Sequence, residues 1–180
     1  ILENIDYAKE LGFKIKVNMV VQKGLNDLEI ISMADYFKSR QITLRFIEYM
    51  DVGNRNGWKM ERVLLSENIL QMISQNYQLE SVEAEDVGEV AKRFQYKDTQ
   101  SEIGFISSIS NAFCHSCTRV RLSSDGTFFN CLFANEGLDV RKLLREGKDN
   151  GYIIEALKED WTQRSDQYSS ERESVHSSNR

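Results

Sequence analysis

The chain has 180 residues, and its 23 Lys and Arg against 28 Asp and Glu give a formal net charge of -5. Hydrophobic residues make up 41% of it, which is enough to bury a core and excludes wholesale disorder. The acidic balance argues against a general nucleic-acid binder, although it allows a local basic pocket, and no apolar run approaches the roughly 18 residues of a membrane-spanning helix, so we expect neither DNA nor a membrane as partner.

The chain opens on a helical pattern. Apolar residues recur at helical spacing from Ile1 to Leu11, and they predict a helix with Gly12 as its C-capping residue. No Met precedes Ile1 and no capping residue precedes the helix. We therefore interpret the chain as a fragment of a longer protein.

Strand and helix patterns alternate in the next part of the chain. Residues 13–22 (FKIKVNMVVQ) are rich in Val and Ile and predict a strand, and residues 42–50 (ITLRFIEYM) predict another. Between them, Asn26 or Asp27 is expected to cap a helix that runs to Ser39. Short links between such elements are typical of βα units, which implies a parallel sheet whose missing strands we expect upstream.

At roughly 100–200 residues per domain, the length predicts one domain, or one small domain plus a piece of another. Residues 51–57 (DVGNRNG) have the composition of a loop, and we place the domain boundary there, so that the parallel unit covers residues 1–53. A second domain is expected over residues 54–165. The Ser-, Arg- and Glu-rich residues 166–180 are expected to form a flexible tail.

The second domain is predicted to combine helices with short strands. A helix is expected to begin at Ser66, and strand-like segments in antiparallel or mixed arrangement follow over residues 77–110. A hairpin is expected over residues 118–133. Two helical segments are expected after it, over residues 139–146 and 153–164.

Three cysteines are the strongest chemical signal in the chain. They follow the pattern C-x2-C-x13-C at Cys114, Cys117 and Cys131. An odd count at close spacing, without a secretory leader, argues against a disulfide scaffold. The alternatives are a buried cysteine beside a chance C-x-x-C, and a metal site built on all three thiols.

A metal site requires a particular hairpin. The Asp-Gly pair that ends at Gly126 is a strong turn signal between two strand-like segments. A three-residue loop, with Gly126 in the left-handed conformation, would pair Arg121 with Phe129. Because side chains alternate along a strand, this register would bring Cys117 and Cys131 to one face, whereas a two-residue turn would separate them. The metal hypothesis therefore predicts the three-residue loop.

Three thiolates leave one position of a metal site open. Structural zinc usually takes four protein ligands, but His115 lies between two of the cysteines and is poorly aimed, and His176 lies in the tail. Zinc with a water ligand is one interpretation. An iron–sulfur cluster with one iron free to bind substrate is the other, and composition alone does not separate the two.

Four cationic side chains lie at positions where they could bind a ligand. Arg119 and Arg121 lie beside the cysteines, and Lys16 and Arg45 lie within the two predicted parallel strands. They are either solvated strand residues or, for the arginine pair, groups that offset thiolate charge. The functional interpretation is recognition of a phosphate or a purine edge, with Lys16 and Arg45 pointing into a closed barrel.

Residues 113–133 (FCHSCTRVRLSSDGTFFNCLF) resemble the C-terminal cluster motif of the GTP 3′,8-cyclases. These radical S-adenosylmethionine enzymes begin the biosynthesis of the molybdenum cofactor. Similar segments follow one another along nearly the whole chain, namely VNMVVQKGLND, LRFIEYMDVGNRNGW, GEVAKRF, IGFISSIS and RSDQYSSER. The chain is therefore identified from its sequence as a member of this family.

The resemblance implies a fold and a reaction. The fold class is α/β, with the last βα units of an incomplete (βα)6 TIM-type barrel followed by a small α+β domain that binds a cluster. The reaction is that of a lyase, in which a 5′-deoxyadenosyl radical made from S-adenosylmethionine takes hydrogen from ribose C3′ of GTP. C3′ then bonds to guanine C8, and the product is 3′,8-cyclo-7,8-dihydro-GTP.

The resemblance also assigns site residues by position. An auxiliary [4Fe–4S] cluster would be held by Cys114, Cys117 and Cys131. GTP would be contacted by Lys16, Arg45, Arg119, Val120 and Arg121. S-adenosylmethionine would be contacted by Met50. The cations of this set would balance a triphosphate in an otherwise acidic protein.

Two features of the family are absent from this sequence. No C-x3-C-x2-C motif occurs, so the second [4Fe–4S] cluster, which cleaves S-adenosylmethionine, would belong to the longer parent protein. The sequence ends at Arg180 without the family's terminal Gly-Gly. We therefore assign no catalytic residue to this segment and expect it to be inactive alone.

Further partners follow from the resemblance. They are an electron donor such as flavodoxin or ferredoxin, a second copy of the chain in a homodimer, and cyclic pyranopterin monophosphate synthase as the next enzyme of the pathway. The expected location is the cytoplasm.

Three other interpretations stay open. A zinc-ribbon-like binding module without catalytic chemistry is suggested by the C-x2-C hairpin, but it needs a fourth ligand and leaves Lys16 and Arg45 unexplained. Another radical enzyme with an auxiliary cluster would not need Arg119 and Arg121. A remnant with only a structural role is the third.

Overall fold

The computed structural model describes residues 1–51, 57–86, 88–165 and 168. The chain forms two compact units, Ile1–Ala112 and Phe113–Arg180. Among the helices in the described ranges, none has both the length and the apolar character needed to cross a membrane.

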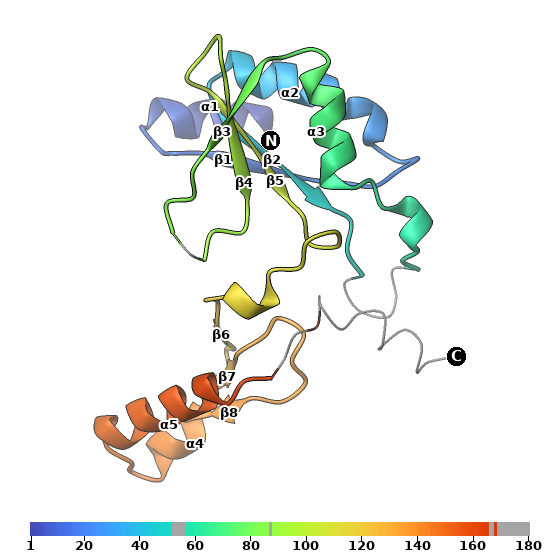
Figure 1. Ribbon diagram of the computed structural model, residues 1–180. Coiled ribbons are helices and arrows are strands. Elements are labelled where there is room, and N and C mark those ends of the chain that lie inside the picture. The colour runs from blue at the N-terminus through green and yellow to red at the C-terminus, as the bar shows by residue number, and fades with distance from the viewer. Residues whose placement is uncertain (52–56, 87, 166–167, 169–180) are drawn as a thin grey trace. The chain divides into compact units, whose positions relative to one another are not determined.

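The first unit is built on one mixed five-stranded sheet (Figure 1). In spatial order its strands are β1 (Lys16–Val21), β2 (Thr43–Glu48), β5 (Glu102–Ile106), β4 (Lys92–Tyr96) and β3 (Leu79–Val82). The first three strands are parallel, and β4 and β3 continue the sheet antiparallel. The α/β class is therefore as expected, and one sheet contains strands from both sides of residue 53.

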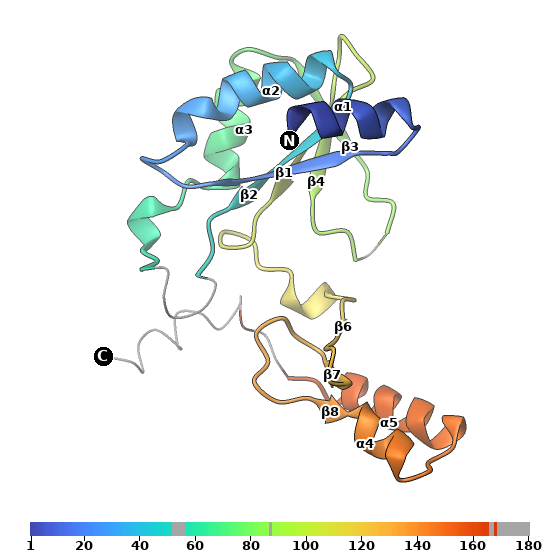
Figure 2. The ribbon, with the colours of Figure 1, turned by 180° about the vertical axis from the view of Figure 1, so that it is seen from behind.

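Three helices lie on one side of this sheet (Figures 1 and 2). They are α1 (Leu2–Glu10), α2 (Ile30–Ser39) and α3 (Ser66–Ser74). Two short 3-10 helices, η1 (Asp27–Glu29) and η2 (Met60–Arg62), lie in the connections.

The core lies between the sheet and these helices. Along β2, Leu44, Phe46 and Glu48 are buried while the residues between them are half buried, so one face of the strand turns toward the helices. Phe37 of α2 and Ile69 of α3 are buried against that face. On the opposite face of the sheet, β1 carries polar side chains. The candidate nucleotide ligands of this unit lie on that opposite face.

Most predicted elements of the first unit are confirmed, but Asn26 and Asp27 do not cap α2. Asn26 Oδ1 accepts a hydrogen bond from the backbone N–H of Gln22 at 2.8 Å, and Asp27 Oδ1 accepts one from Gly24 at 2.8 Å. Both side chains therefore close the turn after β1, and the chain enters α2 through η1. Short Asn and Asp side chains bond to nearby backbone groups in turns as well as at helix ends.

The neighbour of β2 is a second correction. The missing partners of the parallel strands were expected upstream, but β5 supplies one from downstream, with Leu44 opposite Ile103 and Phe46 opposite Phe105. Four consecutive residues of β5, from Ile103 to Ile106, are buried. This burial on both faces suits a central strand of a sheet that includes parallel pairs.

The second unit holds a three-stranded antiparallel sheet and two helices. The strands are β6 (Arg121–Leu122), β7 (Thr127–Phe129) and β8 (Leu138–Asp139), and the helices are α4 (Val140–Arg145) and α5 (Asn150–Thr162). The hairpin and both helical segments are confirmed. The sequence pattern did not predict β8, because a two-residue strand leaves no periodic signal.

The boundary between the two compact units lies in the sequence between Ala112 and Phe113. The predicted division after residue 53 concerns modules of the family and stays a prediction. The predicted tail, residues 166–180, lies outside the described residues except for Tyr168.

Candidate metal and nucleotide site

The cysteine hairpin has the register that the metal hypothesis requires. β6 and β7 pair Arg121 with Phe129. The backbone N–H of Ser123 donates to the carbonyl of Thr127 at 2.9 Å, so the loop has three residues, and Gly126 in it has a φ of 86°. The predicted loop with a left-handed glycine is confirmed, and the two-residue turn is excluded.

Gly126 is required by space as well as by backbone conformation. A Cβ at this position would lie 2.7 Å from Cβ of Arg141 on α4. Beside it, the carboxylate of Asp125 accepts hydrogen bonds from the hydroxyl of Ser123 and, at 3.3 Å, from the backbone N–H of Thr127. These bonds, with that from Ser123 first, lower the pKa of the Asp125 carboxyl. The turn is therefore held from both sides.

All three cysteines are free thiols and partly buried. Cys114 opens the 3-10 helix η3 (Cys114–Ser116), Cys117 follows it, and Cys131 follows β7. In the part of the chain that the structure describes, no three His, Cys, Asp or Glu side chains are close enough to hold a metal ion together. The donor chemistry fits a cluster with three thiolate ligands, because the three thiols are free and partly accessible and that of Cys117 contacts an arginine.

Cys117 is held from two directions. Arg119 Nε donates to Cys117 Sγ at 3.3 Å, and Arg164 Nη2 donates to the Cys117 carbonyl oxygen at 3.2 Å. Burial acts to raise the pKa of the Cys117 thiol, but hydrogen bonds from Arg119 and the charges of Arg119 and Arg164 hold it below its ordinary value. This thiol therefore ionises more readily than a free cysteine, and the thiolate is the form that binds metals.

Arg119 and Arg121 carry charge that no acid neutralises within the described ranges. The guanidinium carbon of Arg119 lies 4.9 Å from the ring centre of Phe113, and Arg121 Nη1 donates to the carbonyl of Val120 at 3.4 Å. Both arginines and Val120 are exposed. Both arginines are thus accessible to an anion.

Lys16 and Arg45 share the sheet face opposite the helices. Asn18 on β1 is paired with Arg45 on β2, and Lys16 precedes Asn18 on the same face. Asn18 Oδ1 accepts a hydrogen bond from Arg45 Nε at 2.8 Å. This bond orients the guanidinium while its two Nη groups can still donate elsewhere.

Gly104 makes room for Arg45. It lies on β5 opposite Arg45, and a Cβ at Gly104 would be 3.1 Å from Arg45 Cγ. The missing side chain lets the aliphatic stem of Arg45 lie against β5. On its other side, Gly104 is paired with Arg93 of β4, so two arginines flank one glycine on the same face.

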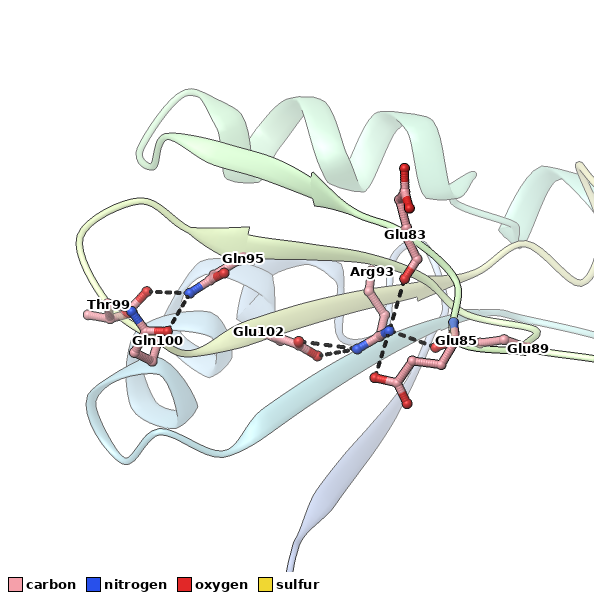
Figure 3. Close-up of polar contacts among 8 residues, drawn as sticks. All are labelled: Glu83, Glu85, Glu89, Arg93, Gln95, Thr99, Gln100 and Glu102. Atoms are coloured by element: carbon pink, nitrogen blue, oxygen red, sulfur yellow. Dashed lines mark hydrogen bonds and ion pairs between the residues drawn. The ribbon is translucent and has the colours of Figure 1, made fainter. Parts of the chain in front are cut away.

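Arg93 differs from Arg45 because acids neutralise it (Figure 3). It forms ion pairs with Glu102 at 3.2 Å, Glu89 at 2.7 Å and Glu85 at 3.0 Å, and it donates to the carbonyl of Glu83 at 3.0 Å. Burial acts to lower the pKa of its guanidinium, but the three carboxylates raise it. Arg93 is therefore a structural residue, whereas Arg45, with no ion pair among the described residues, can bind an anion.

Sequence reasoning missed Glu48, a carboxylate that is only 1% exposed. Its Oε1 accepts hydrogen bonds from the backbone N–H of Ser66 at 2.7 Å and the hydroxyl of Ser110 at 2.6 Å. Its Oε2 accepts from the backbone N–H groups of Ile109 and Ser110, both at 2.8 Å. Burial acts to raise the pKa of Glu48, but these hydrogen bonds, led by that of the Ser110 hydroxyl, hold it below its ordinary value.

Glu48 ties three segments together. It joins the end of β2 to the first turn of α3 and to residues 109–110 after β5. The sequence did contain a signal for the burial of Glu48. Side chains alternate along β2, and Glu48 falls on the same face as Leu44 and Phe46, which are buried. A carboxylate at a core position predicts a network of hydrogen bonds around it.

The predicted site residues lie in both units. Met50, half buried, follows β2 in the first unit, which also holds Lys16 and Arg45. The second unit holds the three cysteines and residues 119–121. The structure thus places Lys16 and Arg45 on one face of the sheet and brings Arg119 into contact with Cys117.

Comparisons with known proteins point to one family. The chain matches the sequence profile described as Molybdenum Cofactor Synthesis C over residues 42–170. It is 51% identical over 173 residues to a GTP 3',8-cyclase of Staphylococcus epidermidis (strain ATCC 35984), which covers 96% of this chain and 51% of the relative. It is 47% identical over 181 residues to a GTP 3',8-cyclase of Staphylococcus aureus (strain Newman), which covers 100% of this chain and 53% of the relative. The chain spans about half the length of the curated relatives it matches.

Proposed function

Because this chain belongs to the Molybdenum Cofactor Synthesis C family, we propose that it is part of a GTP 3′,8-cyclase. The observation that carries the proposal is the 51% identity over 96% of the chain to a protein of that name. The enzyme would convert GTP to 3′,8-cyclo-7,8-dihydro-GTP in the first step of molybdenum cofactor biosynthesis. The contribution of this chain would be to bind and orient GTP.

In this proposal Cys114, Cys117 and Cys131 hold the auxiliary [4Fe–4S] cluster. When bound, the cluster supplies an iron with an open coordination position that can take a purine atom as ligand. The lowered pKa of the Cys117 thiol supports this role, because ligation requires the thiolate. The confirmed three-residue loop supports it as well, because the alternative turn would have placed Cys131 on the wrong face of the hairpin.

Arg119 and Arg121 would bind GTP beside the cluster, with Val120 between them in contact with the nucleotide. Lys16 and Arg45 would bind the phosphates. A guanidinium whose Nε is already bonded, as that of Arg45 is to Asn18, presents two parallel N–H donors that match a pair of phosphate oxygens.

We assign Met50 to S-adenosylmethionine. The parallel strands β1, β2 and β5 with helices on one side support a piece of a (βα)6 barrel, and residues 54–165 would form the cluster-binding domain. Cleavage of S-adenosylmethionine and its electron donor would belong to the longer protein.

The test is the metal content of the chain after anaerobic reconstitution with iron and sulfide. We expect about four irons and four sulfides per chain, with a broad visible absorbance that changes when GTP is added. Adding ATP at the same concentration is the matched control for a guanine-specific response. One zinc and no iron would instead favour a zinc-ribbon-like module and would contradict the proposed function.

A further inference from the structure

The last turn of α5 and the residues just past it contact both of the segments that carry Cys117 and Cys131. Within the thirteen residues of α5, Ile153 is the buried one, so apolar packing fixes this helix over a small area. Its last turn and the residues just past it are attached by polar contacts instead. The partners in these contacts are a predicted cluster ligand, Cys117, and the residue before another, Cys131.

Asp160 of α5 binds the residue that precedes Cys131. Asn130 Nδ2 donates to the backbone carbonyl of Asp160 at 3.0 Å and to its Oδ2 at 2.7 Å. The other amide atom, Asn130 Oδ1, is buried and has no hydrogen-bond partner in the part of the chain described here. A buried acceptor without a donor costs free energy, and the hydrogen bonds of this amide go to Asp160. Beyond α5, the ring of Tyr168 stacks on Phe133 at 4.1 Å between ring centres.

Arg164 binds the backbone of Cys117. Its guanidinium carbon lies 3.6 Å from the ring centre of Trp161, and its Nη1 donates to the carbonyl of Trp161 at 3.4 Å. These contacts fix the plane of the guanidinium. Its Nη2 then donates to the Cys117 carbonyl at 3.2 Å, so the segment just past α5 contacts that backbone group.

We propose that Asp160 and Arg164 are positioning residues for the auxiliary cluster, which together fix the segments of Cys117 and Cys131 relative to each other. The inference rests on the proposed function, because it takes these cysteines as ligands. Asp160 lies in the last turn of α5 and Arg164 lies two residues past its end, so one short stretch of chain holds two ligand segments that the hairpin pairs only along β6 and β7. Holding the two segments to one anchor lowers the conformational entropy that their thiolates lose when they bind one cluster.

The test measures how fast the reconstituted chain loses its cluster to a chelator. The full 180-residue chain is loaded anaerobically with iron and sulfide, EDTA is added, and the decay of visible absorbance and of bound iron is followed. We expect Asp160→Ala and Arg164→Ala to lose the cluster at least about tenfold faster than the wild type. Glu159→Ala and Lys158→Ala also remove one acidic and one basic side chain, but these side chains bond to Gln163 and Glu155, so both variants should lose the cluster at the wild-type rate.

Conservative variants separate positioning from folding. Asp160→Asn keeps an acceptor for Asn130 and should retain the cluster, whereas Arg164→Lys keeps the charge, loses the planar contact with Trp161 and should release it faster. Melting of the cluster-free chain, followed by circular dichroism, should be the same for Arg164→Lys and the wild type. A merely structural role would lower that melting temperature and leave the decay rate of the folded chain unchanged.

The outcomes distinguish this inference from the proposed function. If the wild type takes up about four irons and the Asp160 and Arg164 variants decay at its rate, the positioning role is overturned and the proposed function stands. If the wild type takes up no iron and sulfide, both are overturned.

Discussion

Asn18 accepts a hydrogen bond from Arg45 across two parallel strands, with 2.8 Å between Oδ1 and Nε. The bond holds one edge of the guanidinium on the sheet face opposite the helices. Gly104, paired with Arg45 on the next strand, leaves space for the side chain. The result is an arginine that is oriented without being neutralised, and its neighbour Arg93 shows the opposite arrangement.

Replacing either partner of this pair should weaken GTP binding to the reconstituted chain. We expect Arg45→Ala to lower the affinity about 10- to 100-fold, because hydrogen bonds to charged groups contribute about 1.5–3 kcal/mol. Asn18→Ala should lower it less, by about 3- to 10-fold, since it removes the orientation and not the charge. Equilibrium dialysis with GTP measures both. Lys23→Ala removes an exposed cation past β1 and should bind as the wild type does; an Asn18→Ala affinity equal to that of Lys23→Ala would refute the orienting role.

Replacing Arg93 should change stability and leave GTP binding unchanged. Arg93→Met leaves the carboxylates of Glu85, Glu89 and Glu102 facing one another, and we expect the free energy of unfolding to fall by about 2–3 kcal/mol. The loss is smaller than for a fully buried pair because Glu85 lies mostly in solvent. Urea denaturation measures the change, and adding Glu102→Gln should restore part of it. Weaker GTP binding by Arg93→Met in its folded state would contradict the structural assignment.

Replacing Cys131 should prevent formation of the auxiliary cluster. With Cys131→Ala two thiolates remain, which is too few to retain the cluster, so bound iron should fall close to zero. Iron and sulfide analysis after reconstitution measures it. Ser124→Ala changes a loop residue of the same hairpin and should keep the wild-type iron content. Full iron in Cys131→Ala would show that the ligand assignment is wrong.

Removing both arginines of the hairpin should abolish detectable GTP binding. Arg119→Ala with Arg121→Ala deletes two exposed cations that have no acid partner within the described chain. At about 1.5–3 kcal/mol for each charged contact, the affinity should fall at least about 100-fold. Isothermal titration with GTP measures it, and Arg145→Ala on α4 is the matched control. Unchanged affinity in the double variant would leave the GTP assignment without support.

The contribution of Glu48 to the free energy of unfolding should depend on pH. Hydrogen bonds hold the pKa of its carboxyl below the ordinary 4.5 in the folded chain, so folding favours the ionised form. Its stabilisation is complete above that value and is lost as the pH falls through the lower folded pKa. We expect Glu48→Gln to cost about 1–3 kcal/mol at pH 7 and progressively less below pH ~4.5. Urea denaturation at several pH values measures the difference, with the exposed Glu67→Gln as control; a difference that grows in acid would contradict it.

Local patterns in the chain already determined several features of the structure. The Asp-Gly pair at Gly126 and the strand patterns around it predicted a hairpin, and the spacing of the cysteines required the loop that is observed. The strands at residues 13–22 and 42–50 were also predicted as parallel neighbours. These predictions succeeded because strand propensity and short links act within a few residues. The motif order along the chain also identified the family.

Contacts between distant parts of the chain decided the rest. That β5 rather than an upstream strand lies beside β2, and that Glu48 binds Ser66 and Ser110, depends on how separate segments pack. Arg45 and Arg93 look alike as charged residues in strands. The first is oriented by Asn18 and the second is neutralised by acids, because tertiary packing sets the partners of a long side chain and its position in the sequence does not.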